Sequence, residues 1–232
     1  MNIKRVKDVA RETSEVLNGF LKKNQSTLFF VSGGSAFDVL EKIDEKVLHK
    51  NLAVAMVDER FSADEKINNF LQLKQTEFFK KLIMAGGLFF DSTPVKGESI
   101  ASLTQRFNSF LHTWKRLHPD GTVIALLGMG EDGHTAGIMP FPENKKLFGH
   151  LFQEEEWVVG YDAKDKNQYS LRITTTLTFL KEEVDIAIAY VKGENKKEAL
   201  NRVLAEEGEL AEAPARIWRE MKGVEIYTDI LV

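Results

Sequence analysis

The residues best suited to chemistry follow one apolar run in the middle of the chain. Three glycines fall within six positions there, Gly128, Gly130 and Gly133, with Asp132 and His134 among them. An imidazole titrates near neutral pH and can move a proton, and a nearby carboxylate can orient the ring or a substrate hydroxyl. A glycine-rich turn carrying a surface histidine is the plain alternative. The elements around this stretch decide between the two interpretations.

The run in front of the glycines, Val123–Leu127, has the length and composition of a strand buried on both faces. Glycines at its end permit backbone angles and close approaches that a side chain would block. The carboxyl ends of strands are where open α/β sheets bind ligands. The sequence therefore predicts a ligand site at this strand end.

A second strand end carries a glycine turn. The β-rich run Thr27–Val31 leads directly into Ser32-Gly33-Gly34-Ser35, and residues 36–46 then show helical spacing. A strand, turn and helix in this order direct backbone N–H groups at an anion, commonly phosphate. A simple turn with a left-handed glycine is the alternative, since glycine pairs are common punctuation.

A third apolar run, Leu52–Val57, ends in Asp58, Glu59 and Arg60. These charges are typical of a solvated turn. They also suit an orienting carboxylate beside a guanidinium that binds an anion.

Strand and helix patterns alternate along the rest of the chain. Helical spacing covers residues 2–23, 64–84 and 99–118, and further strands are expected at 87–90, 157–159, 170–176, 185–191 and around 225–227. This alternation predicts one doubly wound α/β domain over residues 1–232, with a mainly parallel sheet between helices in a Rossmann-like, three-layer arrangement.

Composition excludes several classes of protein. Hydrophobic residues make up 43% and charged residues 28% of the 232, as in soluble globular chains. The net charge of −4 and the lack of a basic stripe give no footprint for nucleic acid. With no cysteine, disulfides, thiolate metal sites and cysteine nucleophiles are ruled out. No stretch approaches the ~20 apolar residues of a membrane span, and the first residues lack a signal core, so we expect a cytoplasmic protein.

Taken together, these motifs resemble the 6-phosphogluconolactonase family, within the superfamily that it shares with glucosamine-6-phosphate deaminase. The matching segments occur in the family's order and spread over nearly the whole chain. They are Ser32–Ser35, Val57–Arg60, Leu127–Ala136, Arg172–Thr174, Gly193–Lys196 and Pro214–Ala215. The long match through Gly130, Asp132 and His134 is the most specific of them.

Two details favour the lactonase branch over the deaminase branch. The deaminases typically carry Asp-Glu-Tyr where this chain has Asp58-Glu59-Arg60. They also place a ring-opening glutamate where this chain has Met139, whose thioether cannot act as an acid or base. Residues 137–141 depart from the family's usual continuation, and Asn69 stands about one residue away from a family asparagine. We expect these changes to affect the rim of the site rather than the histidine.

The resemblance implies hydrolysis of 6-phospho-D-glucono-1,5-lactone in the oxidative pentose phosphate pathway, without cofactor or metal. His134 is the expected general base, and Asp132 is expected to orient either that imidazole or the sugar hydroxyls. N–H groups around Gly128 to Gly130 are expected to face the oxyanion. Arg60, the third expected catalytic residue, is assigned to a direct substrate contact, either binding the phosphate or polarising the lactone. The remaining substrate-binding residues implied by the family pattern are Gly33, Gly34, Ser35, Asp58, Asn69, Gly130, Arg172 and Lys196.

Among those residues, the N–H groups of Gly34 and Ser35 and the charges of Arg172 and Lys196 are expected to hold the phosphate. The expected partner is the small phosphosugar lactone, with no nucleic acid or membrane, in a monomer or small homo-oligomer. Two alternatives stay open: an aminosugar-phosphate isomerase or deaminase, and a non-catalytic sugar-phosphate-binding protein.

Overall fold

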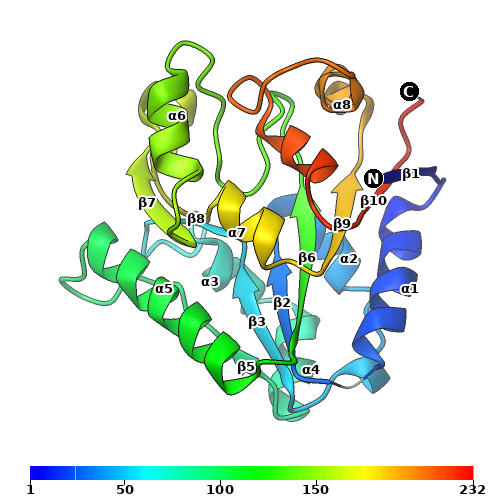
Figure 1. Ribbon diagram of the computed structural model, residues 1–232. Coiled ribbons are helices and arrows are strands. Elements are labelled where there is room, and N and C mark those ends of the chain that lie inside the picture. Colours follow the sequence, from blue (N-terminus) through cyan, green and yellow to red (C-terminus); the bar gives the residue numbers. More distant parts are fainter. Residues whose placement is uncertain (24, 232) are drawn as a thin grey trace.

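A seven-stranded parallel sheet forms the centre of the computed structural model, which describes residues 1–23 and 25–231 (Figure 1). Asn24 and Val232 lie outside the described residues. The strand order is β1-β10-β9-β6-β2-β3-β5, and every pairing is parallel. The bounds are β1 Asn2–Arg5, β2 Thr27–Val31, β3 Leu52–Met56, β5 Leu88–Phe89, β6 Thr122–Gly128, β9 Ile186–Val191 and β10 Val224–Thr228. The prediction of an α/β fold with a mainly parallel sheet is confirmed.

Helices cover both faces of this sheet, and each face has its own apolar core (Figure 1). On one face lie α1 (Val9–Leu21), α2 (Phe37–Leu40), α3 (Asn69–Leu73) and α4 (Glu77–Met84). On the other lie α5 (Ile100–Leu117), α6 (Lys145–Phe152), α7 (Leu177–Glu182) and α8 (Lys197–Leu204). Because both faces are covered, β2 and β3 are buried at every position, as their apolar runs predicted.

A small antiparallel sheet stands beside the large one. Its strands are β4 (Asp58–Arg60), β8 (Leu171–Thr175) and β7 (Val158–Asp162), with β8 in the middle. The charged triplet is therefore a strand of its own, separated from β3 by Val57. This placement aligns Arg60 with Arg172 across the pair β4–β8.

Three expected helices differ from those observed. Residues 2–5 form the edge strand β1, and helix α1 begins only after the N-cap Asp8, whose carboxylate accepts the N–H of Arg11. Residues 64–84 contain two helices, because the Thr76 hydroxyl caps a new helix by accepting the N–H of Phe79. The helix expected over 36–46 is only the single turn α2, followed by a 3-10 turn at Glu45–Val47.

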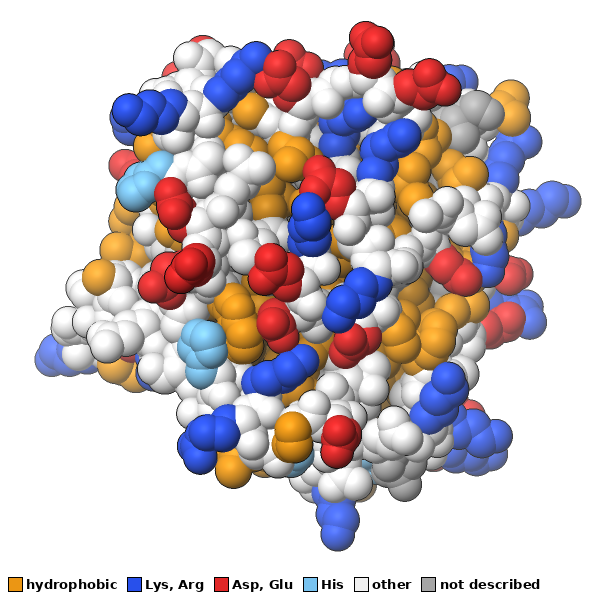
Figure 2. Space-filling model, viewed as in Figure 1, with side chains coloured by type: hydrophobic (Ala, Val, Ile, Leu, Met, Phe, Trp, Pro, Cys, Tyr) orange, Lys and Arg blue, Asp and Glu red, His pale blue; other side chains and the backbone are white. Residues whose placement is uncertain are grey.

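The face of the molecule seen in Figure 2 carries both signs of charge. Figure 2 shows Lys and Arg side chains interspersed with Asp and Glu over the face viewed, with apolar surface between them. Within the described residues, no helix has the combination of length and apolar composition needed to cross a membrane.

Candidate functional site

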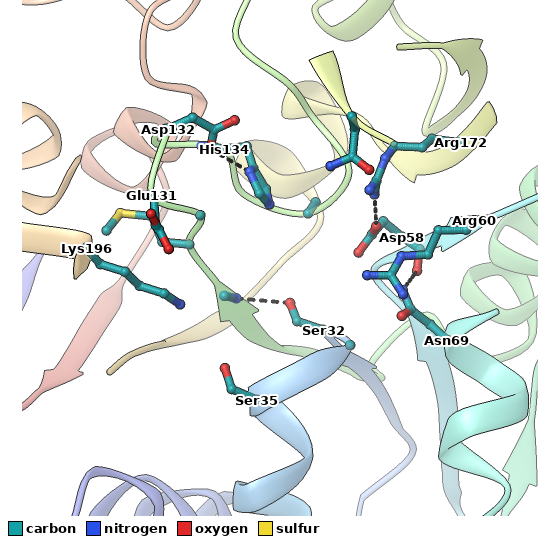
Figure 3. A pocket seen from close by; sticks show the side chains of 16 residues that line it. Ser32, Ser35, Asp58, Arg60, Asn69, Glu131, Asp132, His134, Arg172 and Lys196 are labelled. Atoms are coloured by element: carbon teal, nitrogen blue, oxygen red, sulfur yellow. Dashed lines mark hydrogen bonds and ion pairs between the residues drawn. The ribbon is translucent and has the colours of Figure 1, made fainter. Parts of the chain in front are cut away.

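A pocket of about 480 Å³ opens at the carboxyl ends of β2 and β6 (Figure 3). These two strands are neighbours in the sheet, and the chain proceeds outward from them in opposite directions. Such a switch in strand order leaves a crevice for ligands. The expected site residues that line it are Gly33, Ser35, Asp58, Arg60, Asn69, Gly130, Asp132, His134, Arg172 and Lys196. Gly34 is the one expected residue that does not line it.

His134 and Asp132 form a contact pair at the top of the pocket in Figure 3. Nδ1 of His134 lies 2.6 Å from Oδ1 of Asp132, and the same oxygen accepts the backbone N–H of His134 at 3.0 Å. Burial opposes the ionised form of Asp132, but the contact with His134 outweighs it, and the pKa of the carboxyl is lowered. Gly130 makes the arrangement possible, because a Cβ there would overlap the imidazole ring.

Asp58 and Arg172 form a buried ion pair on the opposite side of the pocket. Nη1 of Arg172 lies 2.9 Å from Oδ2 of Asp58, and their side chains are only 4% and 9% exposed. The guanidinium that was expected to serve the phosphate is thus already paired with a carboxylate. A buried pair of this kind is costly to break, so it fixes the wall of the pocket.

Arg60 and Asn69 lie beside this pair (Figure 3). Arg60 donates from Nη1 to the carbonyl of Ile67 at 3.0 Å. The amide of Asn69 donates from Nδ2 to the carbonyl of Asp58 at 3.0 Å, while its buried Oδ1 has no partner among the described residues. Gly33 faces this amide, and a Cβ on Gly33 would overlap it.

Ser35 and Lys196 line the other end of the pocket (Figure 3). Burial lowers the pKa of Lys196, although the charges of Glu131 and Asp229 partly restore it. Gly34 has a φ of +66° and is the first residue of the 3-10 turn Gly34–Ala36 that follows β2. Gly34 itself does not line the pocket.

Two of the expected oxyanion donors already make hydrogen bonds within the protein. The N–H of Gly128 donates to Oγ of Ser32 at 3.0 Å, and the N–H of Gly130 donates to the carbonyl of His134 at 2.9 Å. These two groups therefore do not face an oxyanion, because Ser32 just after β2 takes one donor and the His134 carbonyl takes the other. For the N–H of Met129, which lies between them, the expectation stays a prediction.

The structure adds three polar residues to the pocket: Ser32, Glu131 and Asn167. Ser32 holds the end of β6 through its contact with Gly128, and Glu131 accepts the amide of Asn195 at 2.6 Å. Ser32 and Glu131 lie within the family motifs, so the sequence could have indicated them as pocket residues. Asn167 belongs to a loop far along the chain, and no sequence pattern pointed to it.

Residues 138–141 were expected at the rim but belong mostly to the core. Ile138 and Met139 are fully buried, and Phe141 is 5% exposed. The loop is anchored by the Tyr161 hydroxyl, which donates to the carbonyl of Gly137 at 2.5 Å. Ala136 lines the pocket, but residues 137–141, which depart from the family pattern, do not.

Over the described part of the chain, no three His, Cys, Asp or Glu side chains gather in a way that could hold a metal ion.

The fold and pocket place the chain in a class: doubly wound α/β proteins with a polar site at the carboxyl edge of the sheet. The sequence matches the family described as "Glucosamine-6-phosphate isomerases/6-phosphogluconolactonase" over residues 3–227. The chain therefore belongs to this family of enzymes.

Individual relatives are distant but cover most of the chain. It is 26% identical over 220 residues to 6-phosphogluconolactonase 3 of Arabidopsis thaliana, a match that covers 89% of this chain and 65% of the plant protein. The chain thus spans just under two thirds of that relative's length. A 6-phosphogluconolactonase of Helicobacter pylori is 29% identical over 213 residues, covering 90% of this chain and 86% of the relative.

Solved structures share the fold. A 6-phosphogluconolactonase from Trypanosoma brucei superposes with a TM-score of 0.75 at 17% identity, covering 98% of this chain and 95% of that one.

Proposed function

We propose that the protein hydrolyses 6-phospho-D-glucono-1,5-lactone to 6-phosphogluconate, a step of the oxidative pentose phosphate pathway. Family membership supports this, and the relatives named above are 6-phosphogluconolactonases. The observation that carries the proposal is the Asp132–His134 pair, which presents an oriented imidazole to a pocket lined with cationic side chains.

The proposed reaction is attack of water on the lactone carbonyl carbon. Nδ1–H of His134 donates a hydrogen bond to Oδ1 of Asp132, so Nε2 of His134 is left to take a proton from the attacking water. The tetrahedral intermediate then collapses, the bond from the carbonyl carbon to the ring oxygen breaks, and His134 returns the proton to that oxygen. The products are a free hydroxyl and a carboxylic acid, which ionises to the carboxylate by releasing its proton to solvent.

The oxyanion needs a donor other than the N–H groups of Gly128 and Gly130. Arg60 is our candidate, because its guanidinium lines the pocket and is not paired with a carboxylate in the described structure. The charge of Arg172, by contrast, is balanced by Asp58.

The phosphate is assigned to the end of the pocket formed by Ser35 and Lys196. A hydroxyl and an ammonium group together suit a phosphate dianion, and Lys196 has no carboxylate within ion-pair distance in the described structure. Phosphate at this end places the lactone ring between Lys196 and Arg60, below His134 (Figure 3).

An isomerase or deaminase activity requires a second acid or base near Met139. That side chain is fully buried and does not line the pocket, which favours the lactonase. A sugar-phosphate sensor remains the other candidate, and only turnover separates it from an enzyme.

The test is the decay of freshly generated 6-phosphogluconolactone above its spontaneous rate, with wild type, His134→Ala and the surface control His150→Ala. We expect fast hydrolysis by wild type and the control, and a loss of about 100-fold or more in His134→Ala. Full activity in His134→Ala would reject the general base while keeping the lactonase. Binding of the phosphosugar without hydrolysis by wild type would instead identify a sensor, and ketose formation from an aminosugar phosphate would identify the deaminase branch.

A further inference from the structure

Glu59 is a fully buried carboxylate in the middle of β4, and the mechanism above gives it no role. Its neighbours Asp58 and Arg60 line the pocket, whereas Glu59 does not. Alternate residues of a strand point to opposite faces, so Glu59 turns away from the pocket toward the elements behind it.

Four hydrogen bonds satisfy this carboxylate. Oε1 accepts the N–H groups of Arg60 at 2.8 Å and Asn69 at 2.6 Å. Oε2 accepts the N–H of Phe70 at 2.9 Å and the hydroxyl of Ser92 at 2.7 Å. Three of these donors are backbone N–H groups, which can only donate. The arrangement therefore fits a carboxyl group, either ionised or with its single proton donated to the Ser92 hydroxyl. It does not fit an amide of the same shape, because the NH2 group would face an N–H.

Two of the donors are the first N–H groups of helix α3. These groups have no partner within a helix, and the side chain of Asn68 satisfies the next one, that of Leu71, at 2.9 Å. Glu59 thus fastens the start of α3 to β4. The residue at the start of the helix is Asn69, whose side chain reaches the pocket.

The hydrogen bonds from the start of α3 to Glu59 determine where the side-chain amide of Asn69 lies. That amide is held between the carbonyl of Asp58 on β4 and the bare Cα of Gly33 after β2, where even one extra carbon would overlap it. The loop between β4 and α3 also supplies the Ile67 carbonyl that holds Arg60. A shift of α3 relative to β4 would move both pocket side chains.

We propose that Glu59 is a positioning residue, which locks the start of α3 onto β4 and so sets Asn69 and Arg60 for substrate binding. The proposal rests on the function given above. Asn69 and Arg60 touch the substrate, and Glu59 acts only through them.

The principal variant is Glu59→Gln. Its amide nitrogen must face at least one N–H group that can only donate, so the contact with α3 is lost on one side. We expect KM for the lactone to rise about 10-fold or more, and kcat to fall as well, because Arg60 is the proposed oxyanion donor. Ser92→Ala is the matched control, because it removes one of the four hydrogen bonds but leaves the carboxylate and α3 in contact, and its KM should change less than about threefold.

A double-variant comparison with Asn69→Ala separates positioning from general destabilisation. If Glu59 acts through Asn69, Glu59→Gln should raise KM far less in the Asn69→Ala background than in wild type. Effects that multiply fully in the double variant, or an unchanged KM in Glu59→Gln, would overturn the proposal.

Amide hydrogen exchange across residues 68–73 provides a readout that does not depend on catalysis. Faster exchange in Glu59→Gln than in Ser92→Ala is expected, and equal exchange would overturn the proposal even if wild type fails to hydrolyse the lactone. If Glu59→Gln does not fold, Glu59→Asp keeps the charge but is too short to reach both N–H groups of α3, and the same KM and exchange changes are expected.

Discussion

Oδ1 of Asp132 contacts His134 twice, at Nδ1 of the ring and at the backbone N–H. One carboxylate oxygen therefore fixes both the loop and the orientation of the imidazole. This geometry leaves the far ring nitrogen free to meet a water molecule in the pocket.

Asp132→Asn should lower kcat about 10- to 100-fold and leave KM nearly unchanged. The amide can replace the shape of the carboxylate but not its charge, which stabilises the protonated imidazole during the reaction. Steady-state kinetics with the lactone would measure this, with thermal unfolding to confirm the fold. A kcat within twofold of wild type would restrict Asp132 to shaping the loop.

Gly130→Ala should reduce kcat about 100-fold, because its Cβ would overlap the ring of His134 and displace it. Gly128→Ala is the matched control two residues earlier. Its Cβ would have its nearest neighbour, the Cβ of Ser32, at 3.7 Å, which is an ordinary contact. Equal losses of kcat in the two variants would show that the loss in Gly130→Ala does not come from the overlap with His134.

Lys196→Met should weaken binding of the phosphorylated lactone about 10- to 100-fold. It should change the hydrolysis of the same lactone without phosphate less than about threefold, because the assigned role of Lys196 is to meet the phosphate. The measurement is kcat/KM for both substrates. Equal losses for the two lactones would place Lys196 against the sugar ring instead.

Arg172→Met should destabilise the fold by about 3 to 5 kcal/mol, because it leaves the carboxylate of Asp58 buried without a partner. The double variant Asp58→Asn with Arg172→Met should recover most of this free energy of unfolding. Denaturant titrations of the four proteins would measure the coupling. A double variant no more stable than Arg172→Met would show that the pair is not a stabilising unit.

Glu59 should make stability depend on pH. Burial raises the pKa of this carboxyl from 4.5 to about 7, although hydrogen bonds from Ser92 and from three backbone N–H groups oppose the shift. Between pH 4.5 and about 7 the folded protein therefore binds more protons than the unfolded chain. The free energy of unfolding falls as the pH rises through this range, and above about pH 7 this group no longer changes it.

The expected fall from this single group is about 3 kcal/mol. It should appear as the difference between wild type and Glu59→Gln in denaturant titrations at pH 5, 6, 7 and 8. A difference independent of pH would show that the carboxyl keeps an ordinary pKa inside the protein.

Much of the site could be predicted from the sequence. Apolar runs mark strands buried on both faces whatever lies next to them, and glycine motifs at their ends mark where the chain must turn tightly. Parallel strands bring their carboxyl ends to one edge, so Ser35, Arg60 and His134 were expected together before any contact was known, and the structure does place them around one pocket.

Helix boundaries were less predictable, because local pattern does not decide them alone. Residues 2–5 have an apolar spacing that suits a helix, but their backbone pairs with β10 at the other end of the chain. Thr76 falls within the helical pattern of residues 64–84, but in the structure its hydroxyl caps the start of a second helix. In both places a hydrogen bond sets the helix boundary, and the apolar pattern of the sequence does not reveal it.

What the sequence by itself determined is the chemistry: the histidine, its carboxylate, the cationic residues and the strand ends that carry them. Only the tertiary structure decided how those charges are distributed. It paired Arg172 with Asp58 and buried Glu59 behind the pocket against α3. It also bonded the N–H of Gly128 to Ser32 and that of Gly130 to the carbonyl of His134. Each of these depends on which groups meet across the fold, since a charge or a donor acts on a substrate only if no nearer partner has taken it.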